Sequence, residues 1–218
     1  MIEARELYRF YHVGGDETLA LRGVSMEVHA GEIVAVVGPS GSGKSTLMAC
    51  LAGLDEPDGG FVFIYGERLT RRDERDRTAM RARLIGILLQ SGNLFDHLTV
   101  EQNVRLKMLL AGQNDSARIR EVLDHVGISE RRHAYPHQLS GGEASRAGLA
   151  VALAPKPPVL LADEPTGEVD SATEERILAL FDEHRKNGGA SLIVSHSEAI
   201  AKRADRIVRL QDGKVVDA

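Results

Sequence analysis

The chain is poor in cysteine and lacks any long hydrophobic run. Its 218 residues include one cysteine, Cys50, and no tryptophan. A single cysteine excludes an intrachain disulfide and a cysteine-based zinc cage, and it fits a reducing compartment. No apolar run approaches the roughly 20 residues that a helix needs to cross a bilayer, and Met1–Glu6 lacks the features of a signal peptide. We therefore expect a chain that neither spans a membrane nor is exported.

An excess of positive charge is also missing. The chain has 27 lysines and arginines against 32 acidic residues, which gives a formal net charge of −5. This balance argues against a protein that coats DNA or RNA, so no nucleic-acid partner is expected. The length fits one compact domain, or one domain with a small insertion, and the 43% of apolar residues can form a core without disulfides or a structural metal.

Short apolar runs alternate with helical patterns along the chain. A polar loop at Gly14–Asp16 separates the first two runs, the pattern over 99–154 is helical, and Asp212-Gly213 centres a hairpin over 208–216. This alternation predicts an α/β fold with a parallel sheet and an inserted helical subdomain. The predicted strands are Ile2–Phe10, Val24–Val28, Ile33–Val37, Phe61–Tyr65, Leu84–Leu89, Val159–Ala162 and Ser191–Val194.

One stretch between these strands is highly charged. Glu67–Arg83 combines seven arginines with four acidic residues. The mixed signs predict a solvated helix with ion pairs along its surface. Contact with anionic lipid headgroups is the second interpretation, which the interleaved acids weaken.

A glycine-rich loop follows the predicted strand Ile33–Val37 and precedes a helix. Glycines let successive backbone N–H groups point at phosphate oxygens, and the helix N-terminus adds the positive end of its dipole. Lys44 can reach β- and γ-phosphates, and the Ser45 hydroxyl can ligate Mg²⁺. The loop therefore predicts binding of a nucleoside triphosphate. It fits the pattern GxxxxGK[ST] with Gly38, Pro39, Ser40, Gly41, Ser42, Gly43, Lys44, Ser45 and Thr46.

Two adjacent acidic residues end the buried strand Val159–Ala162. The carboxyl ends of strands form the ligand-binding edge of an open α/β sheet. Successive strand side chains point in opposite directions, so one carboxylate can face Mg²⁺ while the other is aimed elsewhere. We assign Asp163 to the metal, directly or through water, and Glu164 to the attacking water, as general base or as the group that orients it.

Gln90 and His196 follow two other predicted strands. Both are expected at the same sheet edge as the phosphate loop. Gln90 can touch Mg²⁺ or the attacking water, and His196 can donate to the γ-phosphate. From pattern alone, a solvated residue or a satisfied core group is the other interpretation of each.

A second helix start has the character of an anion site. Leu139–Glu143 reads Leu-Ser-Gly-Gly-Glu, in which Ser140 and Glu143 form a capping box, while the serine and two glycines, Gly141 and Gly142, can also bind an anion. The chain has only one lysine-bearing loop and one Asp-Glu pair. A nucleotide held between the loop of one copy and this turn of another is therefore favoured over two nucleotides in one chain, and it predicts a head-to-tail dimer.

Together these motifs resemble the nucleotide-binding domain of ATP-binding-cassette transporters, in the family's order over the whole chain. Gly38–Thr46 is similar to the Walker A loop, Gln90 to the Q-loop glutamine, and Leu139–Glu143 to the LSGGQ signature with glutamate as its last residue. By the same resemblance, Asp163 and Glu164 match the Walker B pair, Asp170 the D-loop aspartate, His196 the switch histidine, and Tyr11 the aromatic residue that stacks on adenine. A half-buried strand tyrosine is the other interpretation of Tyr11.

The resemblance implies a RecA-like P-loop core with an antiparallel β subdomain and an inserted helical subdomain. The core and β subdomain are expected over 1–90 and 157–218, and the helical subdomain over 91–156. It further implies an ATPase that uses ATP and Mg²⁺, forms an ATP-closed dimer, and drives a separate membrane permease from the cytoplasmic face of the cell membrane.

Within the superfamily, three stretches look most like the lipoprotein-releasing and macrolide-efflux ATPases: 19–25, 90–104 and 161–167. The chain departs from that group at Glu168-Val169, Ala144-Ser145 and Val151, which leaves the hydrolytic set complete. A regulatory ATPase that gates a cell-envelope or cell-division partner without transport is the alternative. A nucleic-acid or repair ATPase is disfavoured because the chain has one cassette, no long heptads and an acidic balance.

Overall fold

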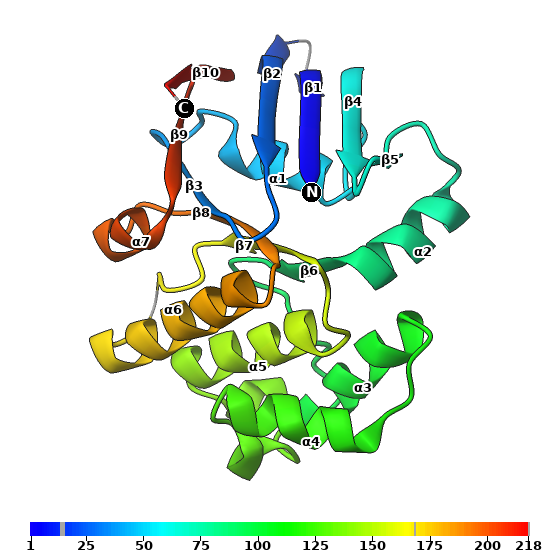
Figure 1. Ribbon diagram of the computed structural model, residues 1–218, viewed down its shortest axis with the longest axis vertical. Coiled ribbons are helices and arrows are strands. Elements are labelled where there is room, and N and C mark those ends of the chain that lie inside the picture. Colours follow the sequence, from blue (N-terminus) through cyan, green and yellow to red (C-terminus); the bar gives the residue numbers. More distant parts are fainter. Residues whose placement is uncertain (14–15, 168, 218) are drawn as a thin grey trace.

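A six-stranded sheet forms the centre of the protein. The computed structural model describes residues 1–13, 16–167 and 169–217, so the loop residues Gly14 and Gly15 and the departure at Glu168 lie outside the described residues. The strand order is β10-β9-β3-β8-β7-β6, with all strands parallel except β10 (Figure 1). These strands are β3 (Ile33–Val37), β6 (Ile85–Leu88), β7 (Val159–Asp163), β8 (Ala190–Val194), β9 (Arg206–Gln211) and β10 (Lys214–Asp217).

The central strands are buried on both faces, as their continuous apolar runs predict. Val34 and Val36 of β3 join the core on one side of the sheet, while Ile33 and Ala35 join the core on the other side. This alternation is the period of two that a strand imposes on its side chains. The predicted fold class is confirmed, and the strand Ile33–Val37 has the predicted bounds.

An antiparallel sheet covers one face of the central sheet, with α1 between the two (Figure 1). Its order is β2-β1-β4-β5; β1 runs on to Val13 instead of ending at Phe10, and β2 begins at Asp16, well before the predicted Val24. The predicted bounds were wrong because register shifts interrupt the period-two pattern on which they rested. The elements are β1 (Ile2–Val13), β2 (Asp16–Val28), β4 (Gly59–Ile64), β5 (Glu67–Arg68) and α1 (Lys44–Leu51).

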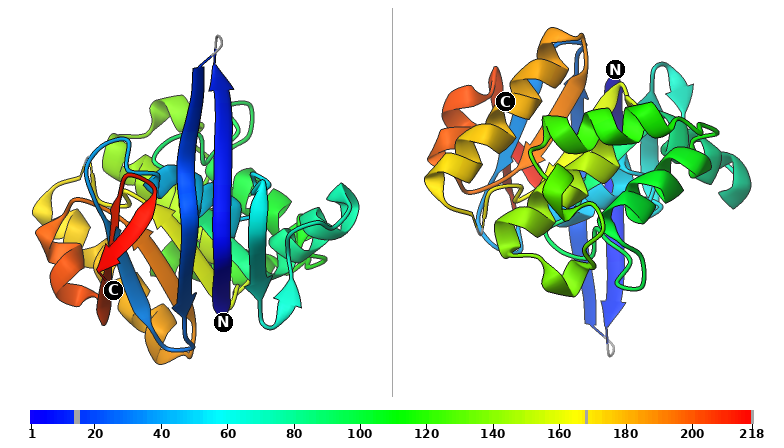
Figure 2. Two further views of the ribbon diagram at one scale, coloured as in Figure 1. Left: turned by 90° about the horizontal axis from the view of Figure 1, so that it is seen from above. Right: turned by 90° about the horizontal axis from the view of Figure 1, so that it is seen from below.

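Helices pack on the opposite face of the central sheet (Figures 1 and 2). Buried apolar residues of these helices meet one face of the sheet in a single core. The helical pattern predicted over 99–154 is present. The helices are α3 (Val100–Leu110), α4 (Ser116–His125), α5 (Gly141–Leu153), α6 (Ser171–Lys186) and α7 (Glu198–Arg203), with 3₁₀ turns at Ser129–Arg131 and Pro136–Gln138.

The arginine-rich stretch forms a shorter helix than predicted. Residues Glu67 and Arg68 pair with β4 as strand β5, and α2 (Glu74–Leu84) begins only after Asp73, whose side chain accepts the Asp76 N–H at 3.0 Å. Met80 is 4% exposed, so the helix is solvated on one side only. The predicted solvated helix with mixed-sign ion pairs is present, but only over Glu74–Leu84, and charge counting did not reveal its apolar contact.

The parallel strands deliver their carboxyl ends to one edge of the sheet. Val36 of β3 pairs with Val194 of β8, Asp163 of β7 pairs with the same Val194, and Leu88 of β6 pairs with Ala162 of β7. The loops that follow these strands therefore start side by side, which is the arrangement in which α/β sheets bind ligands.

Candidate active site

The phosphate loop wraps from the end of β3 to the start of α1. Gly41 has a φ of 79° and Gly43 a φ of 101°, backbone conformations that favour glycine. A Cβ on Gly43 would lie 2.5 Å from the backbone oxygen of Ala20, so a side chain does not fit there. The two glycines therefore permit both the curvature of the loop and its close approach to β2.

Lys44 is buried at the centre of this loop, with 8% of its surface exposed. Its ammonium donates to the backbone oxygens of Gly38 and Pro39 at 2.8 and 2.9 Å. The nearby Ser42 hydroxyl is also buried and has no hydrogen-bond partner among the described residues. A buried cation at a helix N-terminus suits an anionic ligand, whereas Ser42, which was also expected in the site, does not line the pocket that Lys44 lines.

Two oxygen ligands lie close together beside the loop. The Ser45 Oγ lies 3.4 Å from the Asp163 Oδ2. Burial raises the pKa of Asp163, the Ser45 hydrogen bond opposes this rise, and the nearby Glu164 charge adds to it. Gln90 lines the same pocket. Hydroxyl, carboxylate and amide oxygens are the donors that Mg²⁺ prefers, so these residues fit that ion.

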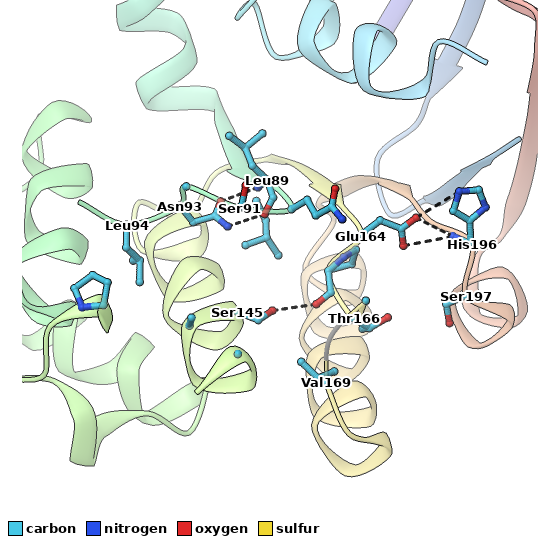
Figure 3. Close-up of a pocket in the computed structure, with 18 of the residues that line it drawn as sticks. Leu89, Ser91, Asn93, Leu94, Ser145, Glu164, Thr166, Val169, His196 and Ser197 are labelled. Carbon is cyan, nitrogen blue, oxygen red and sulfur yellow. Dashed lines mark hydrogen bonds and ion pairs between the residues drawn. The ribbon is translucent and has the colours of Figure 1, made fainter. Parts of the chain in front are cut away.

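Glu164 is held at the end of β7 by residues that follow β8. Its carboxylate accepts the Ser195 hydroxyl at 2.8 Å and the His196 backbone N–H at 3.1 Å, and the His196 Nε2 lies 3.9 Å away. Figure 3 shows Glu164 pointing toward His196. With a φ of 46°, Glu164 adopts a left-handed conformation uncommon for a non-glycine residue. These contacts fix the carboxylate where a water molecule can approach it.

The loop, the carboxylates and Tyr11 line one pocket of about 500 Å³, called here the phosphate pocket. Its wall includes Tyr11 of β1 and residues of β2 as well as the end of β7. Most of the residues singled out from the sequence are brought together in its wall: Tyr11, Ser40, Gly41, Gly43, Lys44, Ser45, Thr46, Gln90, Asp163, Glu164 and His196.

The Ser-Gly-Gly turn and Asp170 lie outside the phosphate pocket. Ser140 caps α5, where its hydroxyl accepts the Glu143 N–H at 3.3 Å, and Gly141 lines a second pocket of about 710 Å³ (Figure 3). Neither Ser140 nor Gly142 lines either pocket. Asp170 caps α6 by accepting the Thr173 N–H at 2.9 Å. One chain therefore does not bring the two predicted anion sites together.

The two pockets meet at Gln90, Glu164 and His196, which line both. The wall of the second pocket also contains a bond that sequence analysis missed: the Ser145 hydroxyl of α5 donates to the Pro165 backbone oxygen at 3.0 Å. Ser195 was missed as well, although its place between a buried strand and His196 was a usable signal. The helix that carries the Ser-Gly-Gly turn is thus bonded directly to the segment that follows Glu164.

The site combines a glycine-rich loop, a buried lysine, two neighbouring oxygens that suit Mg²⁺ and a carboxylate held beside them. Such a set can bind a nucleoside triphosphate with Mg²⁺ and direct water at its terminal phosphate. The fold and site therefore define a P-loop nucleoside triphosphatase.

Comparison with known proteins gives the family. The family profile described as "ABC transporter" matches residues 21–167. An uncharacterised ABC transporter ATP-binding protein of Thermotoga maritima is 42% identical over 99% of this chain and 93% of its own length. A second, from Methanocaldococcus jannaschii, is 37% identical over 100% of this chain and 98% of its own length. The chain belongs to the ABC transporter family, and it is an ATPase that binds ATP with Mg²⁺.

Two further relatives add detail. The macrolide export ATP-binding/permease protein MacB of Escherichia coli is 37% identical over 99% of this chain, which matches 34% of MacB. The solved dimeric structure of the ATP-binding cassette MJ0796, in a post-hydrolysis state with ADP and Pi, superposes with a TM-score of 0.94 at 33% identity, covering 100% of this chain and 97% of that one. Among the helices that the structure describes, none has the length and apolar character needed to span a bilayer.

Proposed function

We propose that two copies of this chain close head to tail around two Mg·ATP and power a separate membrane permease. The observation that carries the proposal is the separation, within one chain, of the Ser140 turn from the phosphate pocket. A second copy can supply the missing turn, and two-fold symmetry would then build two such sites. The dimeric structures of the MJ0796 cassette, at 33% and 34% identity, support this arrangement.

In this proposal, the phosphate pocket holds the triphosphate by its charge. Lys44 and the backbone N–H groups of Ser40–Thr46 bind the β- and γ-phosphates, and the phosphates take the place of the Gly38 and Pro39 oxygens that Lys44 contacts. Ser45, Asp163 and Gln90 would hold Mg²⁺. When bound, this ion neutralises charge that develops on the phosphate oxygens.

Hydrolysis in this proposal uses the group at the end of β7. Glu164 orients a water molecule and accepts its proton as the water oxygen attacks the γ-phosphorus in line. The bond to the β–γ bridging oxygen breaks, and ADP leaves with that electron pair. His196 donates to a γ-phosphate oxygen, while Ser195 keeps the Glu164 carboxylate in place.

Residues outside the catalytic group bind the nucleotide base and join the two copies. Tyr11, which lines the same pocket, stacks on the adenine ring. The turn of the second copy, Ser140, Gly141 and Gly142, then approaches the γ-phosphate, and Asp170 lies at the contact between copies. Residues 91–156 act as a helical subdomain, joined to the core of 1–90 and 157–218.

We place the dimer on the inner face of the cell membrane, bound to its permease. The printed name of MacB assigns ATP binding and a permease to one protein, and this chain matches 34% of it. The Thermotoga and Methanocaldococcus relatives are named as ATP-binding proteins and match over nearly their whole lengths, which favours a separate permease. Export of the efflux or lipoprotein-releasing type is the transport mode that we propose.

Glu164→Gln is the variant that tests the proposal. Loss of the general base should reduce steady-state ATP hydrolysis by about 10²–10⁴-fold while leaving ATP binding intact, so a stable dimer should accumulate with ATP. Turnover is measured as phosphate release, and the dimer by size exclusion with ATP and with ADP. Glu183→Gln, which removes an exposed carboxylate of α6 outside the phosphate pocket, is the control.

Near-normal turnover in Glu164→Gln would contradict the role of Glu164, and a monomer with bound ATP would contradict the shared sites. The same trapped variant tests the partner. Purified with ATP from gently solubilised native membranes, it should bring a permease with it. Recovery without any membrane protein would remove the permease from the proposal and leave the ATPase.

A further inference from the structure

A compact charged cluster contacts Tyr11, which lines the phosphate pocket. Arg9 of β1 makes a bidentate ion pair with Asp55, with Nε and an Nη each 2.9 Å from a carboxylate oxygen, and its other Nη bonds Asp58 at 3.0 Å. Asp55 also accepts the Tyr11 hydroxyl at 2.7 Å. Arg9 and Asp55 keep only 21% and 24% of their side chains exposed. Paired, half-buried charges of this kind hold each other in one geometry.

The cluster forms because β1 extends beyond its neighbour. β4 pairs with β1 only as far as Tyr8, and in Figure 2 β1 and β2 project past the end of β4. Beyond Tyr8, the Phe10 N–H has no partner on β4 and donates to the Asp58 carboxylate at 2.8 Å. Asp55 and Asp58 come from the loop between α1 and β4, so this loop replaces the missing strand.

The same contacts fix the plane of the Tyr11 ring. The Arg9 guanidinium lies over the ring, 4.7 Å from its centre, and Asp55 holds the hydroxyl. Tyr11 lines the phosphate pocket, but Arg9, Asp55 and Asp58 do not. Arg9 therefore covers one face of a ring that itself borders the pocket.

Charge on Asp55 is favoured in this setting. Burial raises the pKa of its carboxyl, but hydrogen bonds from Arg9 and Tyr11 outweigh this and lower that pKa overall. The pKa of the Tyr11 hydroxyl is raised, because burial and the hydrogen bond to Asp55 both disfavour loss of its proton. Tyr11 therefore keeps its proton as the donor, and Asp55 stays the charged acceptor.

We propose that Arg9 and Asp55 are positioning residues that hold the Tyr11 ring open to the nucleotide base and so set how much the base adds to affinity. This rests on the proposed role of Tyr11. The helix α1 connects the phosphate loop, which precedes it, to the loop of Asp55, which follows it. A ring fixed before binding loses less rotational freedom when the base stacks on it.

Comparing ADP with inorganic pyrophosphate tests this inference without hydrolysis. Both ligands use the phosphate loop, and only ADP carries a base. Asp55→Asn keeps the size of the side chain and removes its charge, so it should raise the Kd for ADP about fivefold and leave the Kd for pyrophosphate within about twofold. Arg9→Lys should behave similarly, because lysine cannot form the bidentate pair or cover the ring with a flat guanidinium. Both constants are measured by calorimetric titration with Mg²⁺.

Tyr11 variants separate this inference from the proposed function. Tyr11→Ala should weaken ADP about tenfold, in the range of one lost base–aromatic stack, again without an effect on pyrophosphate. In the Tyr11→Ala background, Asp55→Asn should add nothing further, because Asp55 acts through the ring. Asp182→Asn is the matched control, since its pair with Arg203 has similar exposure and lies away from the phosphate pocket.

The outcomes are distinguishable. Equal ADP affinity in Tyr11→Ala and the parent chain would overturn base stacking by Tyr11, and the inference with it. If Tyr11→Ala weakens ADP but Asp55→Asn does not, stacking stands and the positioning role is wrong. Loss of pyrophosphate and ADP binding together in Asp55→Asn would also overturn it, since that pattern indicates damage to the whole pocket.

Discussion

Two helices of this protein begin in glycine-rich turns, but they satisfy their first N–H groups differently. α1 begins after Gly43, and no described side chain caps it. α5 begins after Ser140 with a complete capping box, in which the Glu143 carboxylate also accepts the Ser140 N–H at 2.8 Å. The start of α1 thus leaves its first donors for a ligand, whereas the capping box of α5 already satisfies the Glu143 N–H.

The charges at the two turns differ as well. The first carries the buried Lys44, and the second carries Glu143, which is paired with Arg131 at 2.8 Å. A phosphate is attracted to the first turn by both charge and free donors. At the second it finds a serine and two glycines but also a carboxylate. We therefore expect the first turn to bind the nucleotide within a single chain, and the second turn to contribute only in the dimer.

Lys44→Ala should give the largest effect, and this effect should already be seen in the ADP affinity of the monomer. Removing a charged donor to phosphate should weaken ADP binding by about 10–100-fold, given 1.5–3 kcal/mol for a bond to a charged group. Calorimetric titration of the monomer with Mg·ADP measures it. Lys202→Ala changes the net charge equally at a site 78% exposed and should not alter binding. Unchanged ADP affinity in Lys44→Ala would break the first half of the comparison.

Ser140→Ala should leave the single chain's ADP affinity intact and impair the dimer. In the Glu164→Gln background, the ATP concentration for half-maximal dimerisation should rise about tenfold, because a donor to the γ-phosphate is lost. The lost cap should also lower the free energy of unfolding by about 1 kcal/mol. Size exclusion and denaturant unfolding measure the two effects.

Thr99→Ala is the matched control for the cap. Thr99 makes the same capping box at the start of α3, outside both pockets. It should lower stability by a similar amount and leave dimerisation unchanged. Equal dimerisation in Ser140→Ala and its parent would show that α5 uses this turn only as a cap.

The sequence predicts the first turn better than the second, and the reason is locality. Two short segments define the first turn and its surroundings: β3 with the phosphate loop, and β7 with the Asp-Glu pair. In each segment the local sequence pattern predicts the conformation, and the order of the strands then places both at one sheet edge. The place of the Ser140 turn relative to the loop depends on contacts of α5 with distant segments, such as the Ser145–Pro165 bond. No local pattern contains that information.

The same limit applies to the base end of the site. Tyr11 can be singled out by resemblance, but its partner Asp55 lies 44 residues further along the chain. The strand bounds that bring them together were also mispredicted, because β1 and β2 contain register shifts. Elements with continuous apolar runs were predictable, whereas irregular strands and side-chain pairs between distant segments were not.

Glu143→Gln should give the smallest effect and sharpen the comparison most. The Ser140 N–H bond and the Arg131 pair lower the pKa of Glu143 to about 2, so the carboxylate is charged at neutral pH. Removing that charge should lower the ATP concentration for half-maximal dimerisation of the Glu164→Gln chain by up to about fivefold, because its repulsion of the γ-phosphate is lost and exposed charges interact by about 0.2–1 kcal/mol. Glu101→Gln is the control, since it removes a first-turn acid paired with Arg105 on α3.

Stability should respond in the opposite direction. Because the pKa of Glu143 is depressed in the folded chain, its stabilisation is present above the ordinary pKa of 4.5 and is lost as the pH falls toward about 2. The parent should therefore exceed Glu143→Gln in free energy of unfolding at pH 6, and the gap should narrow at pH 3. If the difference in free energy of unfolding stays constant with pH, the packing of Glu143 stabilises the chain and its charge does not. If dimerisation is unchanged, its charge does not interact measurably with the nucleotide. Either result would mean that the two turns differ in geometry and not in charge.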